Sequence, residues 1–118
     1  LGGLAALWLG LEHPDVFPRV GAQSPALLAA PGGRDARRDP EWLTERYAEA
    51  ARLPQRVLLQ AGRLEWLLAP ARRFAAVLAE RGAAHEYREY PGGHNWTTWR
   101  VGLEEGLVDL FGADLDVR

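Results

Sequence analysis

The sequence contains no cysteine, no methionine and no lysine, and Ser24 is its single serine. Without cysteine, the chain can form neither disulfides nor thiolate metal sites, and the redox compartment cannot be inferred. No apolar run is long enough to cross a bilayer, so no membrane partner is expected. The formal net charge of -2, the pI near 5.9 and the scattered arginines argue against nucleic-acid binding.

The composition is that of one globular domain, with 47% hydrophobic and 25% charged residues. Because the chain has no methionine, it has no natural start, and it opens directly on Leu1-Gly2-Gly3 in front of a helical pattern. We therefore expect residues 1–118 to be part of a longer protein. A signal peptide would precede such a part of a protein; a cytoplasmic location is the expectation.

Segments in which apolar residues recur at helical spacing alternate with segments typical of strands, and together they predict four helices and three strands. The strands are expected at Arg19–Gln23, Gln55–Ala61 and Ala84–Tyr90, the second of them buried on both faces. The helices are expected at Leu1–Leu11, at Glu41–Ala51, from Pro70 to a cap at Gly82, and in a last segment with Trp99, Leu103, Leu107 and Leu110 on one stripe. Strands that alternate with helices predict an α/β fold with a parallel sheet and right-handed crossovers.

The sequence also marks where some of these elements begin. Asp39 and Pro40 predict the start of the second helix, because an N-cap oxygen precedes a proline at the first helical position. Pro31–Asp39 is expected to be a loop, and Gly112–Arg118 an acidic, weakly patterned tail.

A histidine, His94, lies in a glycine-rich loop between the third expected strand and the last helix. Pro91 has no N–H to give to a strand ladder, and Gly92 and Gly93 allow the backbone to turn sharply. The loop therefore places an imidazole at the carboxyl edge of the sheet, where α/β proteins bind ligands. Histidine is the usual general base near neutral pH, so His94 is the candidate base, with a structural or capping role as the alternative.

A carboxylate, Glu65, follows Gly62 at the end of the buried strand and so belongs to the same edge. It could accept a hydrogen bond from one ring nitrogen of His94, fix the tautomer and stabilise the imidazolium, as the acid of a triad does. A solvated surface glutamate is the alternative. Ser24 is not favoured as a nucleophile, because Ala26 stands where a tight nucleophile turn needs glycine.

The first two residues, Leu1-Gly2, fit the last two positions of Gly-x-Ser-x-Gly, the nucleophile elbow of α/β-hydrolases. The nucleophilic serine is then expected immediately before Leu1, outside the sequence. The order of what remains, Glu65 and then His94, is the order that this fold requires.

Three stretches, Leu1–Leu7, Gly62–Pro70 and Gly92–Leu103, together resemble the bacterial enterochelin (enterobactin) esterase-like branch of the α/β-hydrolases. The resemblance spans almost the whole sequence. It implies that residues 1–118 are the C-terminal part of a single α/β-hydrolase catalytic domain. It also implies a serine esterase that hydrolyses ester or lactone bonds, with His94 as base, Glu65 as acid and the backbone N–H of Leu1 as one oxyanion donor.

Siderophore esterases of this branch cleave the trilactone of catecholate siderophores or its linear products, so the resemblance implies a small-molecule ester partner such as a ferric catecholate siderophore. It implies no cofactor. Because this substrate carries aromatic rings and negative charge, Arg63, Trp66, Trp96 and Arg100 are expected to contact it through charge and stacking. The alternative is that Trp99 belongs to the core and Arg100 is a solvated or packing residue.

Two other functions stay open at this stage. The chain could belong to an esterase of the same fold for acyl or sugar esters, or to a non-catalytic hydrolase-like domain that lacks the serine and binds an ester or a partner. No metal site is expected, because His13, His85 and His94 show no paired ligand spacing. The sequence does not indicate the oligomeric state.

Overall fold

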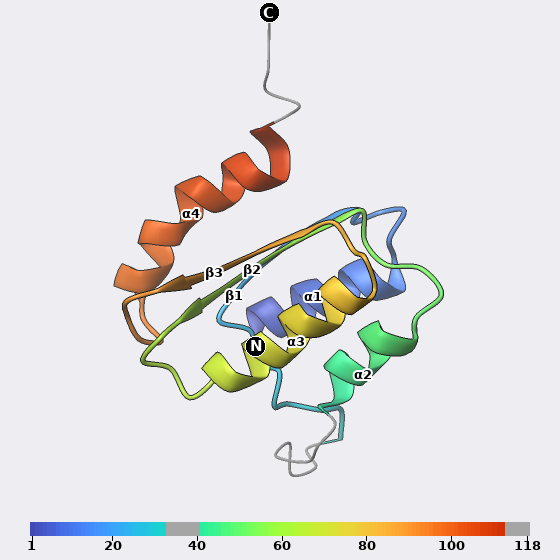
Figure 1. The fold of residues 1–118 in the computed structure, drawn as a ribbon, viewed down its shortest axis with the longest axis horizontal. Helices are drawn as coiled ribbons and strands as arrows, with labels where there is room; N and C mark the ends of the chain where they lie inside the picture. The colour runs from blue at the N-terminus through green and yellow to red at the C-terminus, as the bar shows by residue number, and fades with distance from the viewer. Residues whose placement is uncertain (33–40, 113–118) are drawn as a thin grey trace, which may run out of the picture.

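The computed structural model describes residues 1–32 and 41–112, and the chain in it alternates between helices and strands (Figure 1). The elements in chain order are α1 (Gly2–Glu12), β1 (Arg19–Gln23), α2 (Trp42–Glu49), β2 (Arg56–Gly62), α3 (Leu68–Glu80), β3 (His85–Tyr90) and α4 (Trp96–Phe111). The predicted α/β class is confirmed, and the six elements for which a start was predicted are found within two residues of it. Asp39, Pro40 and most of the expected loop and acidic tail lie outside the described residues.

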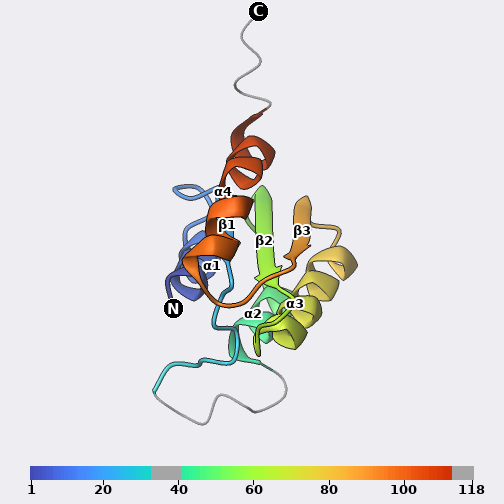
Figure 2. The same cartoon turned by 90° about the vertical axis from the view of Figure 1, so that its left-hand side faces the viewer.

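The three strands form one parallel sheet in the order β1-β2-β3 (Figure 2). The central strand β2 is buried from Val57 onward, as its continuous apolar run predicts for a strand covered on both faces. Figure 1 shows α1 and α3 on one face of the sheet, with α2 outside them, and α4 on the other face. Because the strands are parallel, their last residues lie at the same end of the sheet, its carboxyl edge. These residues are Gln23, Gly62 and Tyr90.

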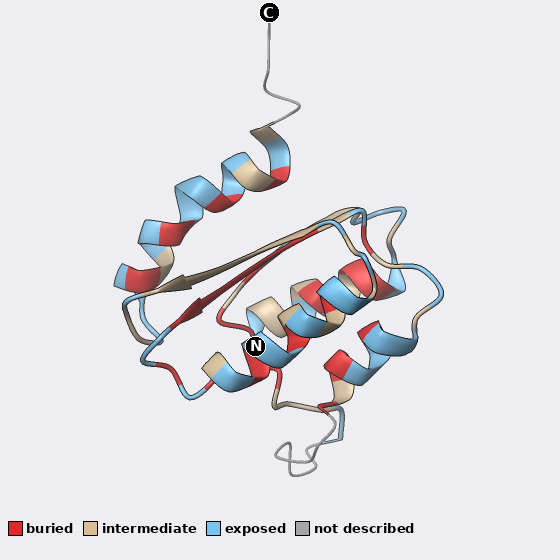
Figure 3. Ribbon diagram, viewed as in Figure 1, coloured by how far each residue is buried: buried red, intermediate tan, exposed pale blue. Residues whose placement is uncertain are grey.

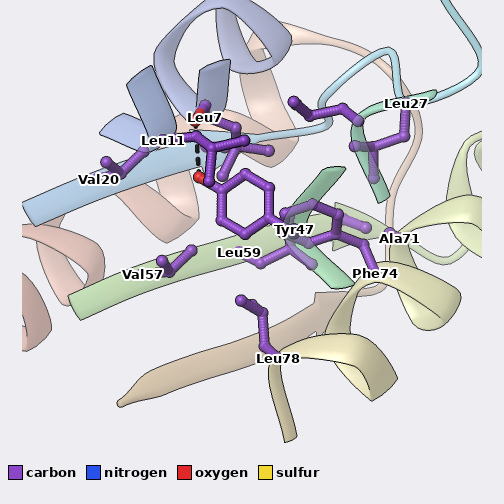
Figure 4. Close-up of a cluster of buried hydrophobic side chains, with 13 residues drawn as sticks. Leu7, Leu11, Val20, Leu27, Tyr47, Val57, Leu59, Ala71, Phe74 and Leu78 are labelled. Atoms are coloured by element: carbon purple, nitrogen blue, oxygen red, sulfur yellow. Dashed lines mark hydrogen bonds between the residues drawn. The ribbon is translucent and has the colours of Figure 1, made fainter. Parts of the chain in front are cut away.

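The hydrophobic core lies between the sheet and the layer of α1, α2 and α3 (Figures 3 and 4). Tyr47 and Phe74 fill its centre and meet edge to face with ring centroids 4.7 Å apart. The Tyr47 hydroxyl donates a 2.6 Å hydrogen bond to the backbone oxygen of Leu7, so a buried polar atom is satisfied and α2 is tied to α1. Burial raises the pKa of the Tyr47 phenol far above its usual range.

The last helix, α4, packs on the sheet mainly through small residues, and of the three leucines in the expected stripe Leu110 is buried while the other two are not. Its buried residues are Thr98, Gly102, Gly106 and Leu110. Leu103 and Leu107, which the expected stripe placed inside, are 52% and 50% exposed. A Cβ at Gly106 would lie 2.6 Å from the Leu58 side chain, and the Gln60 side chain donates a 2.8 Å hydrogen bond to the Gly102 carbonyl. Close approach of the helix backbone therefore decides which face turns inward.

Two helix ends follow from backbone geometry. The residue after α3 and its C-cap, Gly82, has φ 64°, which confirms the predicted glycine cap, because this left-handed conformation carries little penalty without a Cβ. The helix α2 ends two residues before the expected Ala51, because Ala50 is extended with φ -61° and ψ 139°.

An ion pair on the surface gives a testable pH dependence. Glu89 of β3 accepts hydrogen bonds of 2.8 and 2.9 Å from Arg72 and one of 2.7 Å from the Tyr87 hydroxyl. The Arg72 hydrogen bond, followed by that of Tyr87, lowers the pKa of Glu89 from 4.5 to about 2. The folded pKa lies below the unfolded one, so the carboxylate stabilises the fold above pH 4.5, and this contribution is lost as the pH falls toward 2.

We therefore expect Glu89→Gln to lower the free energy of unfolding at pH 7 by about 1 kcal/mol or less, because Arg72 is solvent-exposed. The difference between variant and wild type should close between pH 4.5 and pH 2. Denaturant unfolding at a series of pH values measures both quantities. A difference that stays constant down to pH 2 would contradict the assignment.

Candidate active site

Two loops at the carboxyl edge of the sheet are joined to each other by backbone hydrogen bonds. The N–H of Arg63 donates to the Tyr90 oxygen at 2.8 Å, and the N–H of Leu64 donates to the Gly92 oxygen at 3.0 Å. A Cβ at Gly62 would collide with the Gly92 carbonyl, so only glycine allows this approach. The loop after β2 and the loop after β3 are therefore held as one unit.

Glu65 points its carboxylate into this unit, and its side chain has no exposed surface. One oxygen, Oε2, accepts hydrogen bonds from the Gly62 N–H at 2.5 Å and the Ser24 hydroxyl at 2.7 Å. The other oxygen, Oε1, lies 2.5 Å from Nδ1 of His94. A buried carboxylate needs such partners, because burial without them costs several kcal/mol. The solvated alternative for Glu65 is therefore wrong.

The His94 ring is oriented by Glu65 on one edge and by two tryptophans on its sides. Trp66 lies against it with ring centroids 5.0 Å apart, and Trp99 meets it edge-on at 4.9 Å. With Nδ1 on the carboxylate, the proton of the neutral ring is held at Nδ1 and Nε2 keeps a lone pair. The side chain is 33% exposed, so Nε2 can receive a proton from a reacting group. The arrangement is that of an acid and a base prepared for proton transfer.

The helix that follows His94 is fixed at its first residues. The Asn95 side chain accepts a 3.1 Å hydrogen bond from the Thr98 N–H and so caps α4. A Cβ at Gly92 would collide with the Thr98 hydroxyl, which brings the loop close to the first turn of the helix. His94 therefore stands directly before a capped helix, and its backbone position depends on the packing of α4.

The four expected substrate contacts all lie on these two loops or on the first turns of α4. Trp66 is 68% exposed and Trp96 is 76% exposed, and Trp96 joins the cluster by packing edge-on against Trp99 with centroids 5.4 Å apart. Arg63 and Arg100 are also exposed. Trp66 and, through Trp99, Trp96 therefore belong to the aromatic cluster around His94, and the two arginines are exposed on the same segments of the chain.

Leu1, the expected oxyanion donor, precedes the first turn of α1 and is exposed. A Cβ at Gly3 would lie 3.1 Å from Pro25 and 3.2 Å from the Gln23 oxygen, so the start of α1 packs against the end of β1. The N-terminus of α1 therefore belongs to the same edge of the sheet as Glu65 and His94.

The sequence analysis gave no role in the site to two of its residues, Ser24 and Trp99. Ser24 follows β1 and is buried, and its hydroxyl binds Glu65 and not His94. Trp99, for which a core position was the alternative, is only partly buried and contacts both His94 and the Ser24 hydroxyl. The place of Ser24 at the end of a strand was the only signal in the sequence for its role, since its contacts with Glu65 and Trp99 span 41 and 75 residues.

Within residues 1–32 and 41–112, no three histidine or acidic side chains gather closely enough to hold a metal ion. No helix among the same residues has the length and apolar character that crossing a membrane requires.

The sequence and the structure of the chain are both similar to those of esterases. The model of the family described as Putative esterase matches residues 1–110. The iron(III) enterobactin esterase of Escherichia coli K12 is 34% identical over 114 residues, which is 93% of this chain and 28% of that protein. The iron(III) salmochelin esterase of Escherichia coli O6:H1 is 29% identical over 118 residues, or 95% of this chain and 29% of that protein.

Among solved structures, the enterobactin esterase from Shigella flexneri, crystallised in the presence of 2,3-Di-hydroxy-N-benzoyl-glycine, has a TM-score of 0.80 and 31% identity. The match covers 97% of this chain and 30% of that one. The chain thus spans less than a third of the length of these relatives.

Proposed function

Because the chain belongs to the esterase family whose model it matches over residues 1–110, we propose that it supplies the acid and base of a serine esterase. The observation that carries the proposal is the 2.5 Å contact between Glu65 and Nδ1 of His94 at the carboxyl edge of a parallel sheet. The nucleophile is a serine immediately before Leu1. Residues 1–118 are then the C-terminal part of one α/β-hydrolase domain, and a cytoplasmic location stays a prediction.

The reaction is acyl transfer in two steps. The serine oxygen attacks the ester carbonyl while Nε2 of His94 takes the hydroxyl proton, and Glu65 stabilises the imidazolium. The oxyanion accepts a hydrogen bond from the N–H of Leu1, and a second donor comes from outside residues 1–118. The ester C–O bond then breaks, and His94 gives its proton to the leaving alcohol. Water attacks the acyl-enzyme with His94 again as base, which releases the acid and restores the serine.

The proposed substrate is the ester or lactone of a catecholate siderophore. The relatives at 34% and 29% identity are named for enterobactin and salmochelin, which supports this class. The surface around His94 also fits it, since Trp66 and Trp96 offer exposed rings for stacking on catechols. Arg63 and Arg100 offer positive charge to the anionic catecholates.

The test uses the native protein that contains this chain. Treatment with a fluorophosphonate, followed by intact mass and peptide mapping, is expected to add one phosphonyl group to the serine before Leu1. Turnover of a catecholate trilactone should then exceed turnover of short acyl esters. A protein that gains no phosphonyl group would be the non-catalytic binding domain, and faster turnover of short acyl or sugar esters would replace the siderophore as substrate.

A glycine substitution tests the contact between the two loops. A Cβ at Gly62 would collide with the Gly92 carbonyl and come within 3.1 Å of Oε2 of Glu65. Gly62→Ala is therefore expected to move His94 away from the carboxylate and to lower kcat on the order of 10²-fold, as a displacement of about 1 Å can. Gly112→Ala, where a Cβ meets only the Val108 side chain, is the matched control and should leave kcat unchanged. Equal kcat values for both variants would contradict the role of the close contact.

A further inference from the structure

The acid of the proposed pair is itself held by a chain of side-chain hydrogen bonds that begins on α4. The indole Nε1–H of Trp99 donates to the Ser24 hydroxyl oxygen at 2.8 Å. The Ser24 hydroxyl donates to Oε2 of Glu65 at 2.7 Å. The carboxylate in turn faces Nδ1 of His94. The helix α4, the residue after β1 and the loop after β2 thus each contribute one group to a relay that ends on the base.

The chemistry of the first group fixes the direction of the whole relay. An indole N–H can only donate, so the Ser24 oxygen must accept from Trp99. Its own hydrogen is then directed at Glu65, whose oxygen must accept. The Gly62 N–H also donates to this oxygen. With Oε2 occupied by two donors, Oε1 remains as the acceptor for His94, which holds the ring in its Nδ1–H form.

The backbone holds both upstream members in place. Ser24 has φ 48°, the only non-glycine residue with positive φ among residues 1–32 and 41–112, and its N–H donates to the Gln60 oxygen at 2.8 Å. This conformation is strained for a side-chain residue and persists where the surroundings over-determine it. The Trp99 carbonyl accepts a 2.8 Å hydrogen bond from the Gln23 side chain, next to Ser24. The strained backbone of Ser24 therefore directs its hydroxyl toward the Glu65 carboxylate.

We propose that Ser24 and Trp99 are positioning residues for the acid of the reaction, acting through Glu65 on the orientation and tautomer of His94. The inference rests on the proposed function for its effect on turnover. Ser24 is the single serine of the sequence, yet its hydroxyl faces the acid, so it is not the nucleophile. Loss of a hydrogen bond to a charged group should lower kcat on the order of 10-fold and leave KM unchanged, because no substrate contact is removed.

The test compares Ser24→Gly and Trp99→Phe in the native protein. Glycine removes the hydroxyl and accepts the positive φ, and phenylalanine keeps an aromatic ring against His94 but lacks the N–H. Trp8→Phe on α1 is the matched control and should behave as wild type. Two readouts are taken: kcat and KM on an ester substrate, and the tautomer of His94 from its imidazole ¹⁵N shifts. Both variants should lower kcat and reduce the Nδ1–H fraction.

The double variant separates a relay from two independent effects. If the residues act in series, the double variant loses no more kcat than Ser24→Gly alone, because the Trp99 bond acts only through the hydroxyl. Fully additive losses, or single variants with unchanged kcat and tautomer, would overturn the inference. Fluorophosphonate labelling should persist in Ser24→Gly, and its loss would make Ser24 the nucleophile and overturn the inference.

The tautomer readout keeps this inference distinct from the proposed function. A native protein without esterase activity whose His94 loses the Nδ1–H form in both variants would support the positioning role and reject the esterase. An active esterase in which the His94 tautomer is unchanged in both variants would support the proposed function and reject the positioning role. If Ser24→Gly does not fold, the outcome for Trp99→Phe decides.

Discussion

Replacement of His94 by alanine in the native protein is expected to lower esterase turnover on the order of 10⁶-fold, the scale seen when the base of a triad is removed. Without the imidazole, no group takes the serine proton as attack occurs or returns it to the leaving alcohol. Binding should persist, because exposed Trp66 and Trp96 remain beside the vacant position. Single-turnover and steady-state kinetics on the same ester separate the two effects.

The control for this variant is His13→Ala, which removes an exposed imidazole at the end of α1. It should retain wild-type kcat and KM. The melting temperature of both variants shows whether each is folded. A folded His94→Ala protein with wild-type turnover would remove His94 from the mechanism and leave the binding-domain function in its place.

The second large effect is expected from Glu65→Gln, which keeps the shape of the side chain and changes one acceptor into a donor. The Gly62 N–H and the Ser24 hydroxyl both donate at Oε2, so the amide oxygen should occupy that position. The amide nitrogen then faces His94 and donates to Nδ1. The ring is driven to its Nε2–H form, which cannot accept the serine proton, and turnover should fall on the order of 10⁴-fold.

Two measurements check this prediction. The ¹⁵N shifts of the His94 ring should show the Nε2–H tautomer in Glu65→Gln and the Nδ1–H tautomer in wild type. Kinetics should show the loss in kcat, with Glu12→Gln as the control, since Glu12 forms an exposed ion pair with Arg46. Retained turnover with an unchanged tautomer would mean that the carboxylate does not orient the base.

The sequence was sufficient to predict the parallel sheet and the meeting of two side chains at its edge. Strands of a parallel sheet end on the same side, so residues just after two neighbouring strands must lie close together. Glu65 and His94 are such residues, and their contact could be expected although 29 positions separate them. The glycines beside them were equally informative, because a turn without Cβ atoms allows the close approach that Gly62 and Gly92 make.

Other features depend on packing that no local pattern encodes. The stripe of large residues on α4 predicted Leu103 at the interface, but Leu58 and Gln60 project from the sheet there, and glycines fit where leucines do not. Periodicity identifies a helix without deciding whether its bulky or its small face turns inward. The contact between Ser24 and Trp99 spans 75 residues and depends on how α4 packs on the sheet.

The backbone bonds between the loops after β2 and β3 also bear on how the chain can vary in length. An added or deleted residue in either loop would break the bonds from Arg63 and Leu64, and the neighbouring loop would have to move with it. The connections at the opposite edge of the sheet, 13–18, 50–55 and 81–84, lead from a helix into a strand and stand apart from the acid and base. Insertions and deletions among related chains are therefore expected at that amino edge, while the two loops that carry Glu65 and His94 keep a constant number of residues.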